Sequence, residues 1–176
     1  MSERAAPTDV TLDAVSALGD ALRHRGWHLA TAESCTGGLI AGACTAAPGS
    51  SDWFAGGVVT YSNALKSALL GVDAVLIASH GAVSAEVAEA MAQGAVERLA
   101  VDLAVAATGI AGPGGAVPGK PVGTVWLGVA LRGAAGVVAV RARRLQLDGD
   151  RDAVRKASVA HALAWLSETV REGAVR

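Results

Sequence analysis

Short apolar runs alternate with helix-like segments along most of this chain, and this alternation limits the fold more than any other feature. Runs typical of strands occupy residues 27–32, 57–61 and 102–107, and segments with apolar residues at helical spacing lie between them. Two further runs, 122–131 and 136–147, follow each other closely and predict a hairpin. The order predicts a layered, single-domain α/β fold with a mixed β-sheet flanked by helices.

The helices expected around this sheet have recognisable ends. Ser84 suits the N-cap of one helix, and Gly71 ends another. The predicted helices cover residues 10–24, 37–46, 62–70, 86–100 and 150–171. The domain is therefore expected to span residues 10–172, after a flexible N-terminus at residues 1–9.

Charge and apolar length exclude several classes of protein. The apolar stretch 122–140 approaches the length of a membrane span, but it contains Arg132 and the small-residue run 133–136, which favour a turn. A net charge of −1 gives no basic surface for nucleic acid. The N-terminus is polar and lacks the apolar centre of a signal peptide, and the two cysteines form no C-x-x-C pair. We therefore expect a cytoplasmic protein without membrane or nucleic-acid partners.

The stretch TAESCTGG, residues 31–38, places Ser34 directly after a predicted strand. If a helix begins near Thr36 or Gly37, its first amides lack partners within the helix and can stabilise an oxyanion. Gly37 and Gly38 would let a ligand approach the backbone closely. Ser34 is thus a candidate nucleophile, and an ordinary helix cap is the alternative.

A serine nucleophile needs a base, and the sequence offers two kinds. The four histidines form no metal-type pair, and only His80, in a glycine-containing loop, is kept as a reserve candidate. Lys66 falls in the first turns of a predicted helix, where the helix dipole and apolar neighbours favour the neutral amine. Tyr61 ends the preceding strand and could relay or orient a proton. The alternative is a solvated surface lysine beside a strand-end tyrosine.

Two further segments could bind a ligand. Residues 108–123 are rich in glycine and proline, and successive amides in such a loop can form an anion-binding nest, although the pattern matches neither the dinucleotide fingerprint nor the P-loop. Arg151, in the first turn of the last helix, could contact a phosphate. Neighbouring aspartates make plain surface pairing the alternative for Arg151.

Six motifs occur together in this chain: TAESCTGG, GSSDWFAGGVVTYSNALKSALLGV, HGAVS, TGIAGPGG, KPVGTVW and GDRDAVR. In this order and spacing they closely resemble the CinA C-terminal domain family, whose enzymatic members are nicotinamide-nucleotide amidases. The resemblance covers nearly the whole chain. The family also includes longer proteins with an additional N-terminal molybdopterin-binding-like domain, and the short segment before Val10 suggests the stand-alone form.

The resemblance implies hydrolysis of the carboxamide of nicotinamide mononucleotide to nicotinic acid mononucleotide and ammonia, as part of pyridine nucleotide salvage. It makes Ser34 the nucleophile, Lys66 the base and Tyr61 an assisting residue. It implies no metal and no cofactor, a pyridine nucleotide as the small-molecule partner, and a homo-oligomer, expected to be a dimer. The expected substrate-binding residues are Glu33, Thr36, Gly37, Gly38, Thr108, Gly109, Ile110, Ala111, Gly112 and Arg151. For Glu33, which could meet the ribose hydroxyls or the pyridinium, a structural hydrogen-bond role is the alternative.

Two other functions remain open at this point. One is a nucleotide-binding or regulatory module linked to competence or DNA damage, which keeps the pocket without significant catalysis. The other is amidase activity on a different carboxamide, which the same cleft would serve.

Overall fold

The computed structural model describes residues 10–173, so the expectation of a flexible segment at 1–9 lies outside the described residues. The strands are β1 (Leu29–Glu33), β2 (Phe54–Val59), β3 (Leu103–Gly109), β4 (Thr124–Arg132) and β5 (Val138–Gln146). The α-helices are α1 (Leu12–Arg25), α2 (Leu39–Thr45), α3 (Asn63–Leu70), α4 (Ala74–His80), α5 (Ala85–Arg98) and α6 (Arg151–Glu172), with a short 3-10 turn, η1, at Ser50–Asp52.

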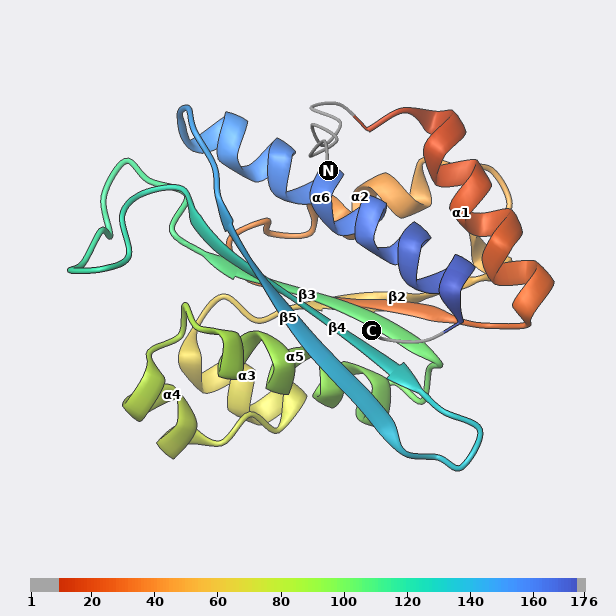
Figure 1. Cartoon of the computed structure of the whole chain (residues 1–176), viewed down its shortest axis with the longest axis horizontal. Helices are drawn as coiled ribbons and strands as arrows, with labels where there is room; N and C mark the ends of the chain where they lie inside the picture. Colours follow the sequence, from red (N-terminus) through yellow and green to blue (C-terminus); the bar gives the residue numbers. More distant parts are fainter. Residues whose placement is uncertain (1–9, 174–176) are drawn as a thin grey trace.

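The five strands form one mixed sheet in the order β2-β1-β3-β4-β5 (Figure 1). β1 runs parallel to both β2 and β3, whereas β4 is antiparallel to β3 and to β5. The apolar stretch that approaches membrane-spanning length is the β4–β5 hairpin. The predicted α/β fold with a mixed sheet and flanking helices is confirmed.

Helices cover both faces of the sheet (Figure 1). α1, α2 and α6 pack on one face around a core that includes Leu22, Leu103, Leu127 and Leu166. α3, α4 and α5 pack on the other face, where the smaller core includes Val87 and Met91 and the alanines of β1 and β3. With few aromatic residues, the chain builds these cores from Leu, Val and Ala, and the resulting apolar burial holds the layers together.

Small residues let α5 approach the sheet closely. A Cβ atom at Gly128, in the middle of β4, would collide with the carbonyl oxygen of Ala88 on α5. Any larger residue at position 128 would therefore push the helix away from the sheet.

Four chain segments meet at one edge of the sheet: the carboxyl ends of β1, β2 and β3, and the connection from β5 to α6. The carboxyl ends of the parallel strands β1, β2 and β3 lie at this edge, as expected for a ligand-binding edge of an α/β sheet. Gly109 pairs with Val125, and Thr124 pairs with Gln146, so β5 also ends there. The N-terminus of α6 consequently begins beside the ends of the parallel strands.

The structure differs from the sequence-based prediction at three elements. α2 begins at Leu39 rather than Gly37, because residues 34–38 form a turn in which Gly37 and Gly38 have φ of 61° and 97°. β2 begins at Phe54 rather than residue 57, because Gly56 and Gly57 obscure the apolar pattern, and it ends at Val59, so Tyr61 lies beyond the strand instead of ending it. α4 was not predicted, although Asp73 caps it by accepting a hydrogen bond from the Val75 amide.

Candidate functional site

Ser34 lies in the turn that follows β1, as the sequence predicted. Its amide donates to the carbonyl of Ala107 on β3 at 2.9 Å, so the turn stays tied to the sheet. The side chain is nearly buried, with 9% of its surface exposed. Because the turn projects from the carboxyl edge of a parallel strand, the hydroxyl faces the region where the four segments meet.

Lys66 reaches this hydroxyl from α3. Ser62 caps α3 by accepting a hydrogen bond from the Leu65 amide, and Lys66 follows in the first turn of the helix. Its Nζ atom lies 3.1 Å from Ser34 Oγ and 2.8 Å from the carbonyl oxygen of Thr60. Only 1% of the lysine is exposed, and this burial lowers the pKa of its amine from the ordinary value of 10.5. The surface-lysine alternative is therefore wrong.

Tyr61 and Arg151 form the outer part of the same region. The Tyr61 side chain is 61% exposed, and its hydroxyl accepts a hydrogen bond from Arg151 Nη2 at 3.1 Å. Arg151 Nη1 also donates to the carbonyl of Gly112 at 2.9 Å. Arg151 thus contacts the tyrosine and the glycine-rich loop, and not the neighbouring aspartates that the sequence offered as its partners.

Glu33, expected as a ligand contact, instead binds the amides at the N-terminus of α2. It is fully buried, and its carboxylate accepts hydrogen bonds from the amides of Gly38, Ile40 and Ala41 at 2.8–3.0 Å. These are amides that the helix itself cannot satisfy. The side chain therefore turns back into the protein and supports the nucleophile turn.

The amides expected to hold an oxyanion are only partly free. The Gly37 amide donates to the Ser34 carbonyl at 3.1 Å, and the Gly38 amide is bound to Glu33. In the described part of the chain, the amides of Cys35 and Thr36 donate to no carbonyl or carboxylate; the Cys35 thiol lies against them. Burial raises the pKa of this thiol to about 11, so it stays protonated. The candidate oxyanion donor is thus the amide of Cys35, whereas Thr36 is fully buried and the Gly37 amide is already bound.

Ser34 and Lys66 open into a cavity of about 230 Å³, which we call the serine cavity. Its lining combines the predicted site with residues that sequence reasoning missed. The lining residues are Ser34, Cys35, Tyr61, Asn63, Lys66, Ala82, Val83, Thr108, Gly109, Ala111 and Arg151. Of the other expected contacts, Thr36, Gly37, Gly38, Ile110 and Gly112 are outside this lining.

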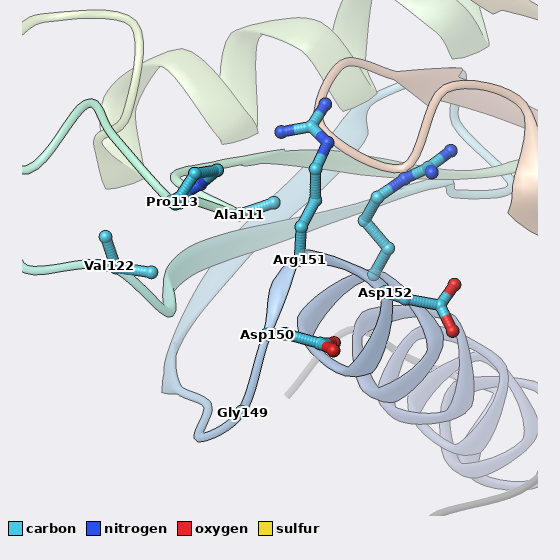
Figure 2. A pocket seen from close by; sticks show the side chains of 8 residues that line it. Ala111, Pro113, Val122, Gly149, Asp150, Arg151 and Asp152 are labelled. Atoms are coloured by element: carbon cyan, nitrogen blue, oxygen red, sulfur yellow. The ribbon is translucent and has the colours of Figure 1, made fainter.

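A larger cavity of about 500 Å³ adjoins the first one (Figure 2). The two share Ala111 and Arg151, so the arginine stands between them. We call this space the arginine cavity. Its lining residues are Ala111, Pro113, Val122, Gly149, Asp150, Arg151, Asp152 and Arg155.

Asn63, Ala82 and Val83 could not be assigned to the site from the sequence. Asn63 starts α3, and its place follows from the position of Lys66 one turn later. The other two lie in the loop before α5, which Thr108 fixes by donating its hydroxyl hydrogen to the Ala82 carbonyl at 2.7 Å. This hydrogen bond between β3 and a distant loop leaves no signal in the sequence.

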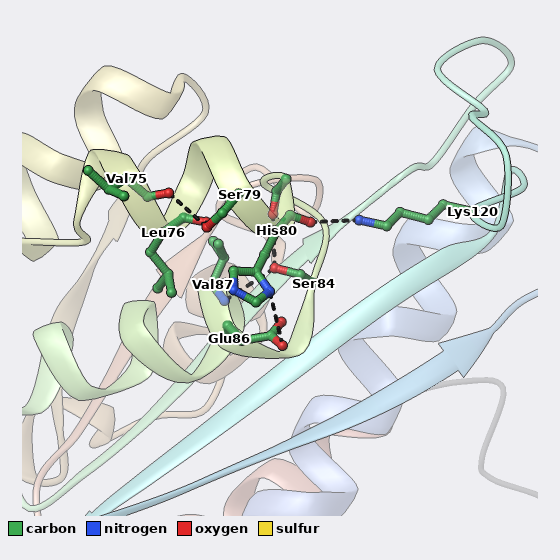
Figure 3. A network of polar contacts seen from close by, with 9 residues as sticks. Val75, Leu76, Ser79, His80, Ser84, Glu86, Val87 and Lys120 are labelled. Carbon is green, nitrogen blue, oxygen red and sulfur yellow. Dashed lines mark hydrogen bonds and ion pairs between the residues drawn. The ribbon is translucent and has the colours of Figure 1, made fainter.

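His80, the reserve candidate for the base, belongs to a separate polar network (Figure 3). Its Nδ1 lies 3.2 Å from Glu86, and its carbonyl accepts a hydrogen bond from Lys120 Nζ at 2.9 Å. His80 is outside the lining of the serine cavity. Lys120 instead ties the glycine-rich loop to the end of α4.

The fold and the site together define a class: single-domain α/β proteins that carry a buried serine–lysine pair at the carboxyl edge of a mixed sheet. Residues 12–170 match the sequence profile of the CinA C-terminal domain. The chain is 53% identical over 154 residues to a putative competence-damage inducible protein of Symbiobacterium thermophilum and 56% identical over 145 residues to a CinA-like protein of Mycolicibacterium gilvum. These matches cover 85% and 82% of this chain, but 36% and 33% of the relatives.

Solved structures show the same likeness over their whole length. A CinA superfamily protein from Klebsiella pneumoniae superposes with a TM-score of 0.86 at 36% identity, covering 93% of this chain and 99% of that one. The competence/damage inducible protein CihA from Agrobacterium tumefaciens gives 0.84 at 39% identity, covering 97% and 99%. The chain belongs to the CinA C-terminal domain family, which confirms the resemblance found in the sequence. It spans about a third of the length of the curated relatives that it matches. Within residues 10–173, no helix combines the length and apolar character needed to cross a membrane.

Proposed function

We propose that this domain hydrolyses the carboxamide of nicotinamide mononucleotide, giving nicotinic acid mononucleotide and ammonia. The observation that carries the proposal is the hydrogen bond of 3.1 Å between Lys66 Nζ and Ser34 Oγ in a water-poor position. A lysine can act as a base only when its amine is neutral, and burial of Lys66 lowers its pKa in that direction.

In the proposed acylation step, Lys66 takes the proton of Ser34 as Oγ attacks the carboxamide carbon. The negative charge that develops on the carbonyl oxygen would be met by the amide of Cys35, which lines the serine cavity. Lys66, now an ammonium, or Tyr61 then passes a proton to the departing nitrogen, and ammonia leaves an acyl-serine. Water, activated by the neutral lysine, releases the acid and restores Ser34.

The two cavities suggest how the rest of the nucleotide binds. The serine cavity, at about 230 Å³, suits the pyridine ring and its carboxamide. The ribose 5′-phosphate would then extend past Arg151 into the arginine cavity (Figure 2). Arg151 presents a planar guanidinium that binds phosphate well, so we propose that it recognises the phosphate.

The test is ammonia release from nicotinamide mononucleotide by the purified protein. We expect turnover, incorporation of one oxygen from labelled water into the acid product, and loss of at least about 10³-fold in kcat for Ser34→Ala. Ser79→Ala is the matched control, because the Ser79 hydroxyl donates to the carbonyls of Val75 and Leu76 in its own helix and is outside the lining of the serine cavity. A substrate panel including other carboxamides defines specificity.

Saturable binding of nicotinamide mononucleotide without any ammonia release would contradict the amidase proposal. That result would favour a nucleotide-binding or regulatory role for this site. Full turnover by Ser34→Ala would contradict the serine mechanism.

A further inference from the structure

Two arginines, Arg151 and Arg155, lie one helical turn apart at the start of α6, but their guanidinium groups have different contacts. Arg151 contacts Tyr61 and borders both cavities. The guanidinium of Arg155 contacts the turn after β1, where its Nη2 donates to the carbonyl oxygen of Thr36 at 3.1 Å. A Cβ atom at Gly37 would lie 3.3 Å from the same nitrogen. Arg155 therefore packs directly against the turn that carries Ser34.

Most polar groups of this turn are held by a fixed partner. The Thr36 carbonyl accepts from Arg155 and also from the Leu39 amide, at 3.2 Å. The Ser34 carbonyl accepts from the Gly37 amide, and Glu33 binds the amides that follow the turn. A carboxylate thus fixes the amide side of the turn, and a cation fixes one carbonyl. Within residues 10–173, the amides of Cys35 and Thr36 donate to no carbonyl or carboxylate.

Arg155 also lines the arginine cavity, but part of its guanidinium is held inside the protein. Its Nε atom is buried and has no hydrogen-bond partner within residues 10–173. A guanidinium keeps its charge under all ordinary conditions. Arg155 is half-buried, and its charge lies next to the Ser34 turn, where negative charge would develop during acyl transfer.

We propose that Arg155 is a positioning residue for the nucleophile turn. By holding the Thr36 carbonyl, it fixes the peptide between Thr36 and Gly37, and with it the turn that carries Ser34 and the Cys35 amide, and it places a positive charge on this turn. This inference rests on the proposed amidase function for its kinetic consequence. Arg155 would act through the turn, whereas Arg151 would contact the substrate.

The kinetic test uses the full chain and nicotinamide mononucleotide. Arg155→Met removes the charge and the donor, and we expect kcat to fall about 10- to 100-fold with KM changed less than about 3-fold, since misplaced catalytic groups cost rate more than binding. Arg155→Lys keeps the cation and is expected to recover part of the loss. The control is Arg171→Gln, which removes a positive charge from the exposed far end of the same helix and should leave kcat unchanged.

A second readout does not need the natural substrate. A small fluorophosphonate, from which Ser34 Oγ displaces fluoride, reports the reactivity of the serine and of its oxyanion donor, with Ser34→Ala as the blank. We expect the labelling rate of Arg155→Met to fall by a factor similar to that of kcat. If the Met variant does not fold, as judged by thermal unfolding, Arg155→Gln serves in its place with the same expectation.

The outcomes separate this inference from the proposed function. Labelling of Ser34 without ammonia release would contradict the amidase proposal, and the labelling rates would still test Arg155. Unchanged labelling and kcat in folded Arg155→Met or Arg155→Gln would overturn the positioning role. A raised KM at constant kcat would also overturn it, because Arg155 would then be a ligand contact. No labelling of the unaltered protein would overturn it as well, since there would be no reactive turn to position.

Discussion

The Nζ atom of Lys66 lies between two oxygen atoms, 3.1 Å from Ser34 Oγ and 2.8 Å from the carbonyl of Thr60. A neutral amine suits this arrangement, because it can donate one hydrogen to the carbonyl while its lone pair accepts the serine proton. An ammonium could donate to both oxygens but could not act as a base. The protonation state of this one nitrogen therefore decides whether Ser34 is activated.

The activity of the proposed amidase is expected to rise with pH. Below the pKa of Lys66 the amine is protonated and cannot accept the serine proton, so kcat/KM should increase as the pH is raised through that pKa. Burial sets the inflection below the ordinary lysine value of 10.5. A pH profile of kcat/KM for nicotinamide mononucleotide checks this. An inflection at or above 10.5 would contradict an activated lysine.

Replacing Lys66 with methionine is expected to stabilise the fold at neutral pH while removing activity. The unfolded lysine binds a proton up to about pH 10.5, whereas the folded lysine loses it earlier, so the unfolded state binds more protons between the two pKa values. The stability of the unaltered protein therefore rises with pH through this window. Lys66→Met lacks this dependence, and its advantage in Tm should shrink between pH 7 and pH 10.5. A constant difference in Tm would show that the lysine is not penalised by burial.

Tyr61 and Arg151 are expected to affect different kinetic constants. Arg151→Met removes a charge-assisted contact worth about 1.5–3 kcal/mol, so KM for nicotinamide mononucleotide should rise about 10- to 100-fold. Tyr61→Phe keeps the ring and removes the hydroxyl that Arg151 contacts, and it should lower kcat by about 10-fold if the hydroxyl assists proton transfer.

Nicotinamide riboside, which lacks the phosphate, provides the control for Arg151. Its KM should be nearly the same for Arg151→Met and for the unaltered protein. An equal rise in KM for the nucleotide and the riboside would show that Arg151 does not recognise phosphate.

Glu33→Gln is expected to destabilise the protein. The Glu33 carboxylate accepts three amide hydrogen bonds in a fully buried position, and a glutamine would direct its own NH₂ group at one of these donors. A loss of about 2–4 kcal/mol in the free energy of unfolding follows from a buried donor left without a partner. Urea unfolding measures it, with the exposed Glu97→Gln as the control. A change below about 0.5 kcal/mol would contradict the structural role of Glu33.

The sheet and most helices could be predicted from the sequence, because strand-like runs and helical spacing report directly which side chains are buried. The late hairpin was predicted for the same reason: the residues 133–136 interrupt an otherwise continuous apolar stretch. α4 escaped prediction, since seven residues are too few for a clear helical period. At β2 the glycines removed the side chains on which the pattern depends.

The Ser34–Lys66 pair could be suggested but not established by sequence, because 32 positions separate the two residues and only the parallel pairing of β1 and β2 brings them together. Arg155 was beyond reach altogether. Its contact with Thr36 joins the start of α6 to the end of β1, and nothing local to either segment records it. The function of Glu33 was open for a similar reason, since a buried carboxylate and a ligand-binding carboxylate look alike in one sequence.

The loop between β3 and β4 has a wider consequence. It supplies Pro113 and Val122 to the arginine cavity and Ala111 to both cavities, whereas Ser34 follows β1 and Lys66 lies on α3. A change of sequence in this loop would therefore alter the walls of the cavities without replacing either member of the serine–lysine pair.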